Sequence, residues 1–486
     1  MTISTDIIHW IDANQQRFIA LSDKIWEFAE IRFEEVKSAK LQIEVLEEEG
    51  FEVTKGVADM PTAFVASYGK EGPIIAVLGE YDALSGLSQK AGVFVKTPVE
   101  EGASGHGCGH NLLGAGSLAA AIAVKNYIKS HKIPGIIQYY GCPGEEGGSG
   151  KTYMVREGLF DDVDIALCWH PFSTNFIFNL SSLSNIQVYF RFKGISAHAA
   201  AAPHMGRSAL DAVELMNIGA NYLREHIITQ ARLHYAVTNT GGNAPNVVQA
   251  DAEVLYLIRA PTMLQTKEIY ERVKKIAKGA ALMTETEVEI IFDKAASNLI
   301  PNDVVGDVLF EKFKEVGAPQ YTEEEIEFGK KLRQTFNKGE LPELNRYSVF
   351  RKELGEDIIE KIRTKIIFDD IFPNTLPEFT LPGSTDVGDV SWVVPTSQIG
   401  TSCVILGTPG HSWQEVTQCT TSISHKGMIA AAKVMALTAL DFMENTERID
   451  EAKAELKKRL GSTKYESPIT SEIKPNVPEW VFDAMK

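Results

Sequence analysis

The spacing of apolar residues in the first third of the chain switches repeatedly between a helical and a strand pattern. Some segments place apolar side chains on one helical face, and others form short continuous apolar runs, which are typical of buried strands. The predicted elements are helices at 6–30, 36–49, 111–130 and 150–158, and strands at 73–79, 135–140 and 164–169. This order predicts an α/β fold with a mostly parallel, doubly wound sheet and helices on both faces.

After residue 185 the pattern changes to β-α-β-β-α-β, the order of a ferredoxin-like α+β unit. The predicted strands are 186–193, 234–240, 247–258 and 286–293, and the predicted helices are 207–226 and 263–283. We interpret this unit as an insertion into the first domain. The expected division is a catalytic domain (first part, 1–185), an inserted lid and dimerisation domain (186–300), and the second part of the catalytic domain with a C-terminal tail (301–486).

The second part of the catalytic domain is less regular. A further strand is expected at 402–406, where an apolar run returns to the first sheet. Residues 320–380 are rich in charge and are expected to form helices with loops.

Composition narrows the classes of partner. The 486 residues are 44% apolar and 23% charged, an ordinary globular composition, and the net charge is −17. Such a negative charge argues against nucleic acid or an anionic membrane as a partner. The chain starts without a secretory leader, has no apolar span long enough for a bilayer, and carries five scattered cysteines, so a cytoplasmic location is expected.

Four short clusters contain the residues that could bind a metal or take part in catalysis. They are 105–111 (Gly-His-Gly-Cys-Gly-His-Asn), 142–148 (Cys-Pro-Gly-Glu-Glu-Gly-Gly), 169–171 (Trp-His-Pro) and 407–412 (Gly-Thr-Pro-Gly-His-Ser). Three of them follow the carboxyl end of a predicted strand, and the first precedes a helix. Because ligands bind outside the carboxyl ends of strands in open α/β sheets, these clusters are expected to converge in space.

The residue types in these clusters indicate a metal centre. Thiolate, imidazole and carboxylate are the side chains that bind zinc and similar ions, and two ions could share an activated water. In the tandem glutamate pair, one carboxylate can bind metal while the other takes the proton of the water. The expected reaction centre consists of Cys108, His110, Glu145, Glu146, His170 and His411.

Each cluster alone also has an ordinary structural explanation. A Cys-Gly-His turn can simply lead into a helix, a Glu-Glu pair is usually solvated, and a lone loop histidine is usually a surface residue. Their joint placement at strand ends favours the metal centre. His106 is expected behind the ligands, because three ligands in five residues would crowd one site. The remaining thiols are expected to be buried apolar groups, namely Cys142, Cys168, Cys403 and Cys419.

Other catalytic motifs are missing from the sequence. It has no Gly-rich dinucleotide fingerprint after a strand, no phosphate-binding loop with its lysine, no G-x-S-x-G elbow and no paired C-x-x-C motif. A dinucleotide-dependent enzyme, a P-loop enzyme, a serine hydrolase and a structural zinc site are therefore not supported.

At these clusters the sequence resembles the di-metal aminoacylase and carboxypeptidase family, and the resemblance covers most of the chain. It is most specific at 79–84, 105–111, 141–151, 194–203 and 384–392, and it extends from 32–35 to 425–428. The resemblance implies hydrolysis of the amide bond of an N-acyl amino acid. It also implies two divalent metal ions per chain, manganese or zinc, with cobalt possible. The implied ligands are Cys108, His110, Glu146, His170 and His411.

The resemblance assigns further roles. Glu145 matches the general base, and Asp82 matches the aspartate that orients a ligand from behind. His198 matches a histidine of the inserted domain that reaches a reaction centre across a dimer interface and steadies the oxyanion. Asn246 lies where relatives contact substrate. An anionic substrate also needs cations, and the candidates on the inserted domain are Arg207, Arg232 and Arg259.

Two features depart from the family pattern. Many relatives carry aspartate where this chain has Asn111, a change that could retune the metal or mark a subgroup. An insertion at 88–104 separates Asp82 from Cys108, with an open effect on the pocket.

Three functions are consistent with these observations. The first is an amidohydrolase of a small acyl-amino acid, working as a homodimer through the lid domain or with a related subunit. The second is a supporting subunit for a catalytic sister chain, against which the complete set of ligands and base argues. The third is the same machinery acting on another N-acyl amino acid or a dipeptide.

Overall fold

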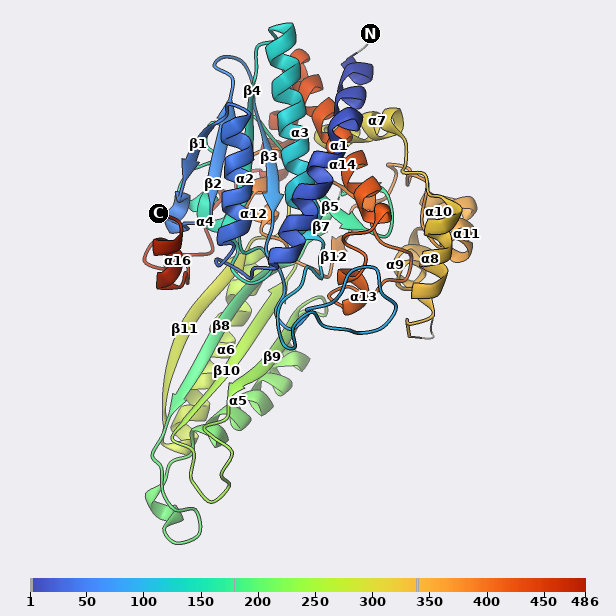
Figure 1. Cartoon of the computed structure of the whole chain (residues 1–486). Coiled ribbons are helices and arrows are strands. Elements are labelled where there is room, and N and C mark those ends of the chain that lie inside the picture. Colours follow the sequence, from blue (N-terminus) through green and yellow to red (C-terminus); the bar gives the residue numbers. More distant parts are fainter. Residues whose placement is uncertain (1–2, 179, 338, 340) are drawn as a thin grey trace.

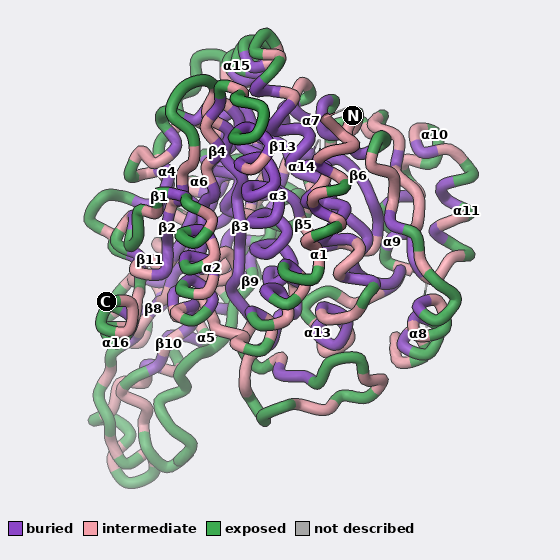
Figure 2. The backbone as a smooth tube through the Cα atoms, turned by 45° about the horizontal axis from the view of Figure 1, so that its top comes forward, coloured by how far each residue is buried: buried purple, intermediate pink, exposed green. Residues whose placement is uncertain are grey.

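The computed structural model describes residues 3–178, 180–337, 339 and 341–486. Its backbone forms a seven-stranded sheet flanked by helices and a separate four-stranded sheet that extends away from the first (Figure 1). Buried residues concentrate in and around the larger sheet, whereas the far end of the smaller unit is mostly exposed (Figure 2).

The larger sheet has the strand order β1-β2-β4-β3-β5-β13-β6. Its four central strands β4, β3, β5 and β13 run parallel, and the edge strands pair antiparallel. The α/β, mostly parallel sheet that the sequence predicts is thus confirmed, while the edge strands β1, β2 and β6 were not predicted. The strands are β1 (Glu52–Lys55), β2 (Phe64–Tyr68), β3 (Ile74–Glu80), β4 (Ile136–Cys142), β5 (Ile165–Phe172), β6 (Phe176–Ile177) and β13 (Thr396–Ser402).

Helices cover both faces of this sheet. One face packs against α1 (Ile3–Phe28), α2 (Val36–Glu48), α3 (His110–His131), α7 (Asp303–Val316) and α14 (Ser422–Glu444). The other face packs against α4 (Gly150–Arg156) and α12 (Val387–Val393). Burial on both sides explains why β3 and β5 are continuous apolar runs rather than alternating ones.

Small residues let α3 lie directly on the sheet. A Cβ atom at Gly114 would come within 2.6 Å of the Glu80 carbonyl oxygen, and one at Gly116 within 2.8 Å of the Trp169 ring. Glycine therefore permits a close approach of α3 to the ends of β3 and β5. This approach brings His110, the first residue of α3, to the carboxyl edge of the sheet.

The smaller sheet has the order β11-β8-β10-β9 and is antiparallel throughout. Numbered along this unit, the order is 4-1-3-2, as expected for the predicted β-α-β-β-α-β segment, and both helices pack on one face. We propose this unit as the inserted lid domain, with boundaries near residues 186 and 300. Its elements are β8 (Ser184–Lys193), α5 (Ala209–Leu223), β9 (Arg232–Asn239), β10 (Asp251–Ala260), α6 (Met263–Thr284) and β11 (Glu287–Ala296).

The charge-rich segment 320–380 is helical with loops, as predicted. Its elements cover β6 and contribute a separate apolar cluster that includes Tyr347 and Ile359. Two positions, 338 and 340, lie outside the described residues. The elements are α8 (Glu323–Arg333), α9 (Pro342–Tyr347), α10 (Arg351–Leu354), α11 (Glu356–Thr364) and β12 (Thr380–Leu381), the last of which pairs with β7 (Ser181–Ser182).

The strand predicted at 402–406 is misplaced. β13 ends at Ser402, and the amides of Cys403 and Val404 both donate to the carbonyl oxygen of Phe172, which ends the ladder with β5. The apolar run 403–406 is buried as irregular chain, and burial alone does not distinguish such a run from a strand.

The C-terminal part of the chain is helical. It forms α13 (Trp413–Val416), α14, α15 (Glu447–Leu460) and α16 (Glu479–Ala484). Within the described ranges, every helix falls short of the length and apolarity that a membrane crossing requires.

Candidate metal centre

The predicted ligands converge at the carboxyl edge of the parallel strands. Cys108 lies just before α3, the tandem glutamates follow β4, and His170 lies near the end of β5. His411 arrives from the irregular chain beyond β13, so its cluster does not follow a strand directly. The convergence is the one expected for an open α/β sheet.

Two groups of three ligand atoms share one thiolate. The first group is Cys108, His110 and His170, and the second is Cys108, Glu146 and His411; within each group all ligand atoms lie within 4.8 Å of one another. The Cys108 Sγ atom is 3.5 Å from Nε2 of His170, and Nε2 of His411 is 3.4 Å from Oε1 of Glu146. All five predicted ligands are therefore brought together around Cys108.

The hydrogen bonding of these atoms fits a metal. The buried atoms Nε2 of His110 and Oε1 of Glu146 make no hydrogen bond within the described residues. His170 donates from Nδ1 to the Pro171 carbonyl oxygen at 2.8 Å, which leaves its Nε2 for a ligand. Burial, and then the charge of His110, lower the pKa of His170 to about 4, so the ring is neutral as a metal ligand must be.

Asp82 forms hydrogen bonds with two parts of the site, His110 and the backbone of Glu146. Its Oδ1 accepts from Nδ1 of His110 at 2.8 Å, and its Oδ2 accepts from the backbone amide of Glu146 at 2.9 Å. Burial opposes protonation of His110, but the carboxylates of Asp82 and Glu80 outweigh it and raise the pKa of His110. The first contact orients the ring, as partners of metal-bound histidines generally do.

His411 has an unusual backbone conformation. Its φ of 52° lies in the left-handed region, which residues other than glycine rarely adopt. Two hydrogen bonds stabilise this conformation, because the His411 amide donates to the Gly107 carbonyl oxygen at 3.1 Å and to Oε2 of Glu415 at 3.0 Å. Such strain concentrates at functional sites, and here it turns the ring towards Glu146.

Glu145 lines a cavity of about 320 Å³ beside these ligands. Its enclosed position, and then the charges of Glu80, Glu146 and Asp386, raise the pKa of Glu145 well above its usual value. A carboxyl group with a raised pKa can exchange a proton nearer to neutral pH. Glu145 therefore combines a place in the cavity lining with a carboxyl group of raised pKa.

Three cations line the same cavity: Arg259, Lys294 and Arg346. Arg259, predicted from the sequence, donates to Oγ of Ser384 at 2.8 Å. Lys294 is buried on β11, and Arg346 comes from α9 in the charge-rich segment; neither was anticipated. In the described part of the chain none of the three forms an ion pair with a carboxylate, although the carboxylates of Glu145, Glu146 and Asp386 line the same cavity.

Arg207, predicted to contact substrate, does not line the cavity of its own chain, and its role stays a prediction. Arg207 pairs with Glu285 at 2.7 Å at the far end of the lid and contributes nothing to the cavity lining. Arg232 is likewise outside it, donating to the carbonyl oxygens of Thr229 and Ala231. For Arg207 the reason is the length of β8, which at about 3.3 Å per residue carries the following segment roughly 30 Å away. Arg232 pairs with Arg259 at the near end of the small sheet, but its side chain donates to neighbouring backbone instead.

His198 and Asn246 lie together at that far end. The amide of Ala199 donates to the Asn246 carbonyl oxygen at 2.9 Å, and both side chains are exposed. Neither lines the cavity of its own chain. The prediction for His198 placed it at a partner's reaction centre, so its role stays a prediction. Asn246 does not line this cavity either, so the substrate contact predicted for it would be made at the site of a partner chain and stays a prediction.

The other predicted residues have structural contacts. His106 is buried, and its Nε2 donates to the Ile25 carbonyl oxygen at 3.1 Å. Asn111 donates to Oγ of Ser22 on α1 and to the carbonyl oxygen of Cys419 in the turn before α14, so its amide joins α3 to these two segments. The insertion 88–104 contacts Thr417 and contributes nothing to the cavity lining. The remaining thiols are buried, as expected: Cys142, Cys168, Cys403 and Cys419.

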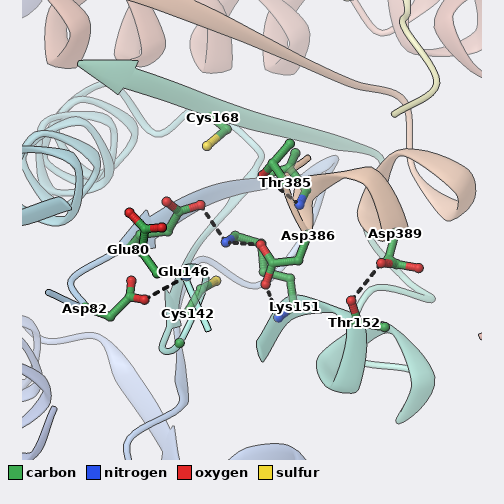
Figure 3. Close-up of polar contacts among 12 residues, drawn as sticks. Glu80, Asp82, Cys142, Glu146, Lys151, Thr152, Cys168, Thr385, Asp386 and Asp389 are labelled. Atoms are coloured by element: carbon green, nitrogen blue, oxygen red, sulfur yellow. Dashed lines mark hydrogen bonds and ion pairs between the residues drawn. The ribbon is translucent and has the colours of Figure 1, made fainter. Parts of the chain in front are cut away.

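A buried ion cluster behind the ligands was missed entirely (Figure 3). Nζ of Lys151 lies 2.5 Å from Oε1 of Glu80 and 2.8 Å from Oδ1 of Asp386, and all three side chains are buried. Glu80 also has an oxygen 3.2 Å from Nε2 of His110 and forms a third ligand group with His110 and Glu145. The only sequence signal was that these residues lie inside the conspicuous motifs 79–84, 141–151 and 384–392.

We expect Lys151→Met to lower the free energy of unfolding of the metal-free protein by about 3–5 kcal/mol, because two carboxylates would stay buried without their cation. Urea unfolding measures this. Lys55→Met is the matched control, since the exposed Lys55–Glu47 pair belongs to a class that contributes about 0–1 kcal/mol. Equal losses in the two variants would contradict a stabilising role for the cluster.

Known proteins with similar sequences decide the family. Residues 76–323 match peptidase family M20/M25/M40. The chain is also 49% identical over 467 residues to a p-aminobenzoyl-glutamate hydrolase subunit of Escherichia coli (strain K12), an alignment that covers 96% of this chain and 97% of that protein. The chain belongs to peptidase family M20/M25/M40. It is accordingly a hydrolase that acts on amide bonds.

Two more distant similarities agree with this assignment. The M20-family chain is 27% identical to Xaa-Arg dipeptidase of Mus musculus, over 93% of this chain and 91% of that protein. Its fold is similar to that of a dinuclear metal-binding peptidase of the M20 family from Bacillus subtilis, with a TM-score of 0.54 and 16% identity over 89% of this chain and 99% of that one. The family and the ligand groups around Cys108 together indicate divalent metal binding.

Proposed function

We propose that this protein hydrolyses p-aminobenzoyl-glutamate to p-aminobenzoate and glutamate. The observation that carries the proposal is a single cavity whose lining holds members of both ligand groups that share Cys108 and three cations without an ion pair in the described chain. The lining ligands are Cys108, Glu146, His170 and His411, and the cations are Arg259, Lys294 and Arg346. The cations suit the two carboxylates of a glutamyl product, because charge-assisted hydrogen bonds to carboxylates are strong and directional. The similarity to the Escherichia coli protein supports this choice of substrate.

We assign the metal ligands as two sets. His110 and His170 hold one divalent ion, Glu146 and His411 hold the other, and Cys108 contributes to both. Manganese or zinc, with cobalt possible, is the proposed metal, since a thiolate beside imidazole and carboxylate ligands accepts each of them. Bound ions would polarise the amide carbonyl group and make water acidic enough to attack at neutral pH.

In this proposal the side chains of the chain move the protons. Glu145 takes a proton from the attacking water and returns it to the departing aniline nitrogen, so that one water is consumed for each amide bond broken. Arg259, Lys294 and Arg346 hold the glutamyl carboxylates. His198 of a second chain steadies the negative charge that develops on the carbonyl oxygen.

The placement of His198 makes an assembly part of the proposal. Its side chain is exposed, far along the lid from the cavity of its own chain. We propose a homodimer through the lid, or a heteromer with a related subunit, as the form that completes each site. The name of the Escherichia coli relative, a hydrolase subunit, keeps the second arrangement open. Another N-acyl amino acid or a dipeptide is the alternative substrate, but repulsion by Arg259, Lys294 and Arg346 disfavours a cationic side chain such as arginine.

The deciding experiment measures p-aminobenzoate release from p-aminobenzoyl-glutamate by the purified chain alone, after loading with manganese or zinc. We expect release that stops on adding a chelator and returns on restoring the metal. p-Aminobenzoyl-lysine, which exchanges one carboxylate for a cation, is the matched control substrate and should be a poor one. No release at full metal occupancy would contradict a self-sufficient enzyme for this substrate, and adding the related subunit then separates a missing partner from a wrong substrate.

A further inference from the structure

The tandem glutamates lie on a short loop, residues 143–148, here called the glutamate loop. Two of its amides are held by carboxylates of the catalytic domain: Gly144 donates to Oε1 of Glu35 at 2.9 Å, and Glu146 donates to Oδ2 of Asp82 at 2.9 Å. Its carbonyl oxygens have a different kind of partner. The oxygens of Glu146 and Gly147 accept from cations that do not belong to the sheet carrying the loop.

The first of these cations is Lys294, on strand β11 of the lid unit. Its Nζ donates to the Glu146 carbonyl oxygen at 2.9 Å, and the side chain is buried. The second is Arg32, whose guanidinium donates to the Gly147 carbonyl oxygen. Arg32 is held in turn by a bidentate pair with Asp293, with both N–O distances at 3.2 Å.

Lys294 reaches the loop and Asp293 reaches Arg32 because β11 is bulged at this point. Phe292 pairs with Val188 and Lys294 pairs with Gln187, so Asp293 is an extra residue in the ladder. A bulge re-aims side chains that would otherwise alternate between the two faces of a sheet. Here it lets neighbouring residues act on one loop, with Gln187 donating to Oδ2 of Asp293 at 2.6 Å.

The catalytic-domain side of the contact is equally tight. Phe33, which follows Arg32, has a left-handed backbone with φ 60°, and its ring packs on the glutamate loop. A Cβ atom at Gly148 would lie 2.4 Å from this ring, and one at Gly144 would lie 2.8 Å from it. The motif 32–35 therefore surrounds the glutamate loop and has no other evident task in the site.

We propose that Arg32, Asp293 and Lys294 are positioning residues that couple the lid to the glutamate loop. Through them the attachment of β11 sets where the backbone of Glu145 and Glu146 lies. A movement of the lid at this bulge would therefore shift the proposed base and one proposed metal ligand together. This inference rests on the proposed function for its catalytic consequence, but the contact itself is independent of the substrate.

The test compares Arg32→Gln, Asp293→Asn and Lys294→Met with Arg191→Gln. Arg191 is the matched control, because it pairs with Glu253 and Glu289 on the same sheet but touches no part of the glutamate loop. The first measurement is hydrogen exchange of the peptide that covers residues 143–150. We expect faster exchange there in the three variants and wild-type exchange in the control, with protection elsewhere unchanged.

The second measurement separates positioning from binding and from general stability. We expect Arg32→Gln and Asp293→Asn each to lose about tenfold or more in kcat with little change in KM, because small misplacements of catalytic groups are costly. Lys294→Met should show the same loss in kcat together with a higher KM, because Lys294 also lines the proposed substrate cavity. Arg32→Gln/Asp293→Asn should be no worse than Arg32→Gln alone, since the pair acts as one unit. Lys294→Arg should restore part of the rate.

Wild-type exchange of the glutamate loop in all three variants would overturn the proposal, as would faster exchange throughout the protein. A fall in kcat without a change in loop exchange would also overturn it. The exchange measurement requires no turnover, so an inactive wild-type protein would count against the proposed function and leave the lid contact to be judged separately.

Discussion

We expect Glu145→Gln to lower kcat by about 10²–10⁴-fold while leaving metal content unchanged. Amide replaces carboxyl with almost the same shape, so the cavity keeps its form but loses the group that carries the proton. Metal analysis together with turnover of p-aminobenzoyl-glutamate measures both effects. Glu146→Gln is the matched control on the adjacent residue, and we expect it to lose metal as well as activity.

The contrast between these two variants separates base from ligand. Metal loss in Glu145→Gln, or full metal retention in Glu146→Gln, would reverse the proposed assignment of the pair.

The Glu145→Gln variant also tests the proposed assembly. Mixing inactive Glu145→Gln chains with inactive His198→Ala chains should restore activity, because a mixed dimer contains one site with both residues intact. Absence of recovery after confirmed exchange of chains would contradict a role for His198 across the interface.

Cys108→Ala has the second large expected effect, the loss of both metal ions and of activity. Its Sγ belongs to both ligand groups, so the substitution weakens each of them. We expect the affinity for metal to fall by more than the roughly 10–100-fold that removal of a group behind a ligand typically costs. Equilibrium dialysis followed by elemental analysis measures the affinity and the number of bound ions.

Cys142→Ala is the control for Cys108→Ala. The Cys142 thiol is also buried near Glu80 and Glu146 (Figure 3). It donates to the Tyr140 carbonyl oxygen and belongs to neither ligand group. Metal binding should survive its removal. If Cys108→Ala kept both ions, or if Cys142→Ala lost them equally, the shared thiolate would not organise the centre.

The ligand residues could be found from the sequence because each lies in a short local pattern. Gly-Cys-Gly-His before a helix and Glu-Glu after a strand are local in sequence, and the rule for open α/β sheets brings them to one edge. The prediction weakens where this locality ends. His411 was found by its residue type, although the apolar run before it proved to be irregular chain rather than a strand. Glu80, which ends β3, was not assigned any role.

The cations of the cavity illustrate a different limit. Arg259 and Arg207 both belong to the lid unit and looked equivalent in the sequence, yet only Arg259 lines the cavity. Arg259 lies near the end of β10 and reaches Ser384, whereas Arg207 comes after the far end of the ten-residue strand β8. Arg346 comes from a helical segment whose packing on β6 could not be predicted from its charge-rich composition.

The sequence by itself determined the α/β class, the lid topology, and the residues that gather around Cys108, because periodicity and ligand chemistry are properties of short segments. Only the tertiary structure decided which charges meet. Lys151 donates to Asp386, which lies 235 residues away in the sequence, and Lys294 contacts the glutamate loop because of a single bulge in β11. Such pairings depend on strand register and on the burial of both partners, and neither is encoded in the neighbourhood of one residue.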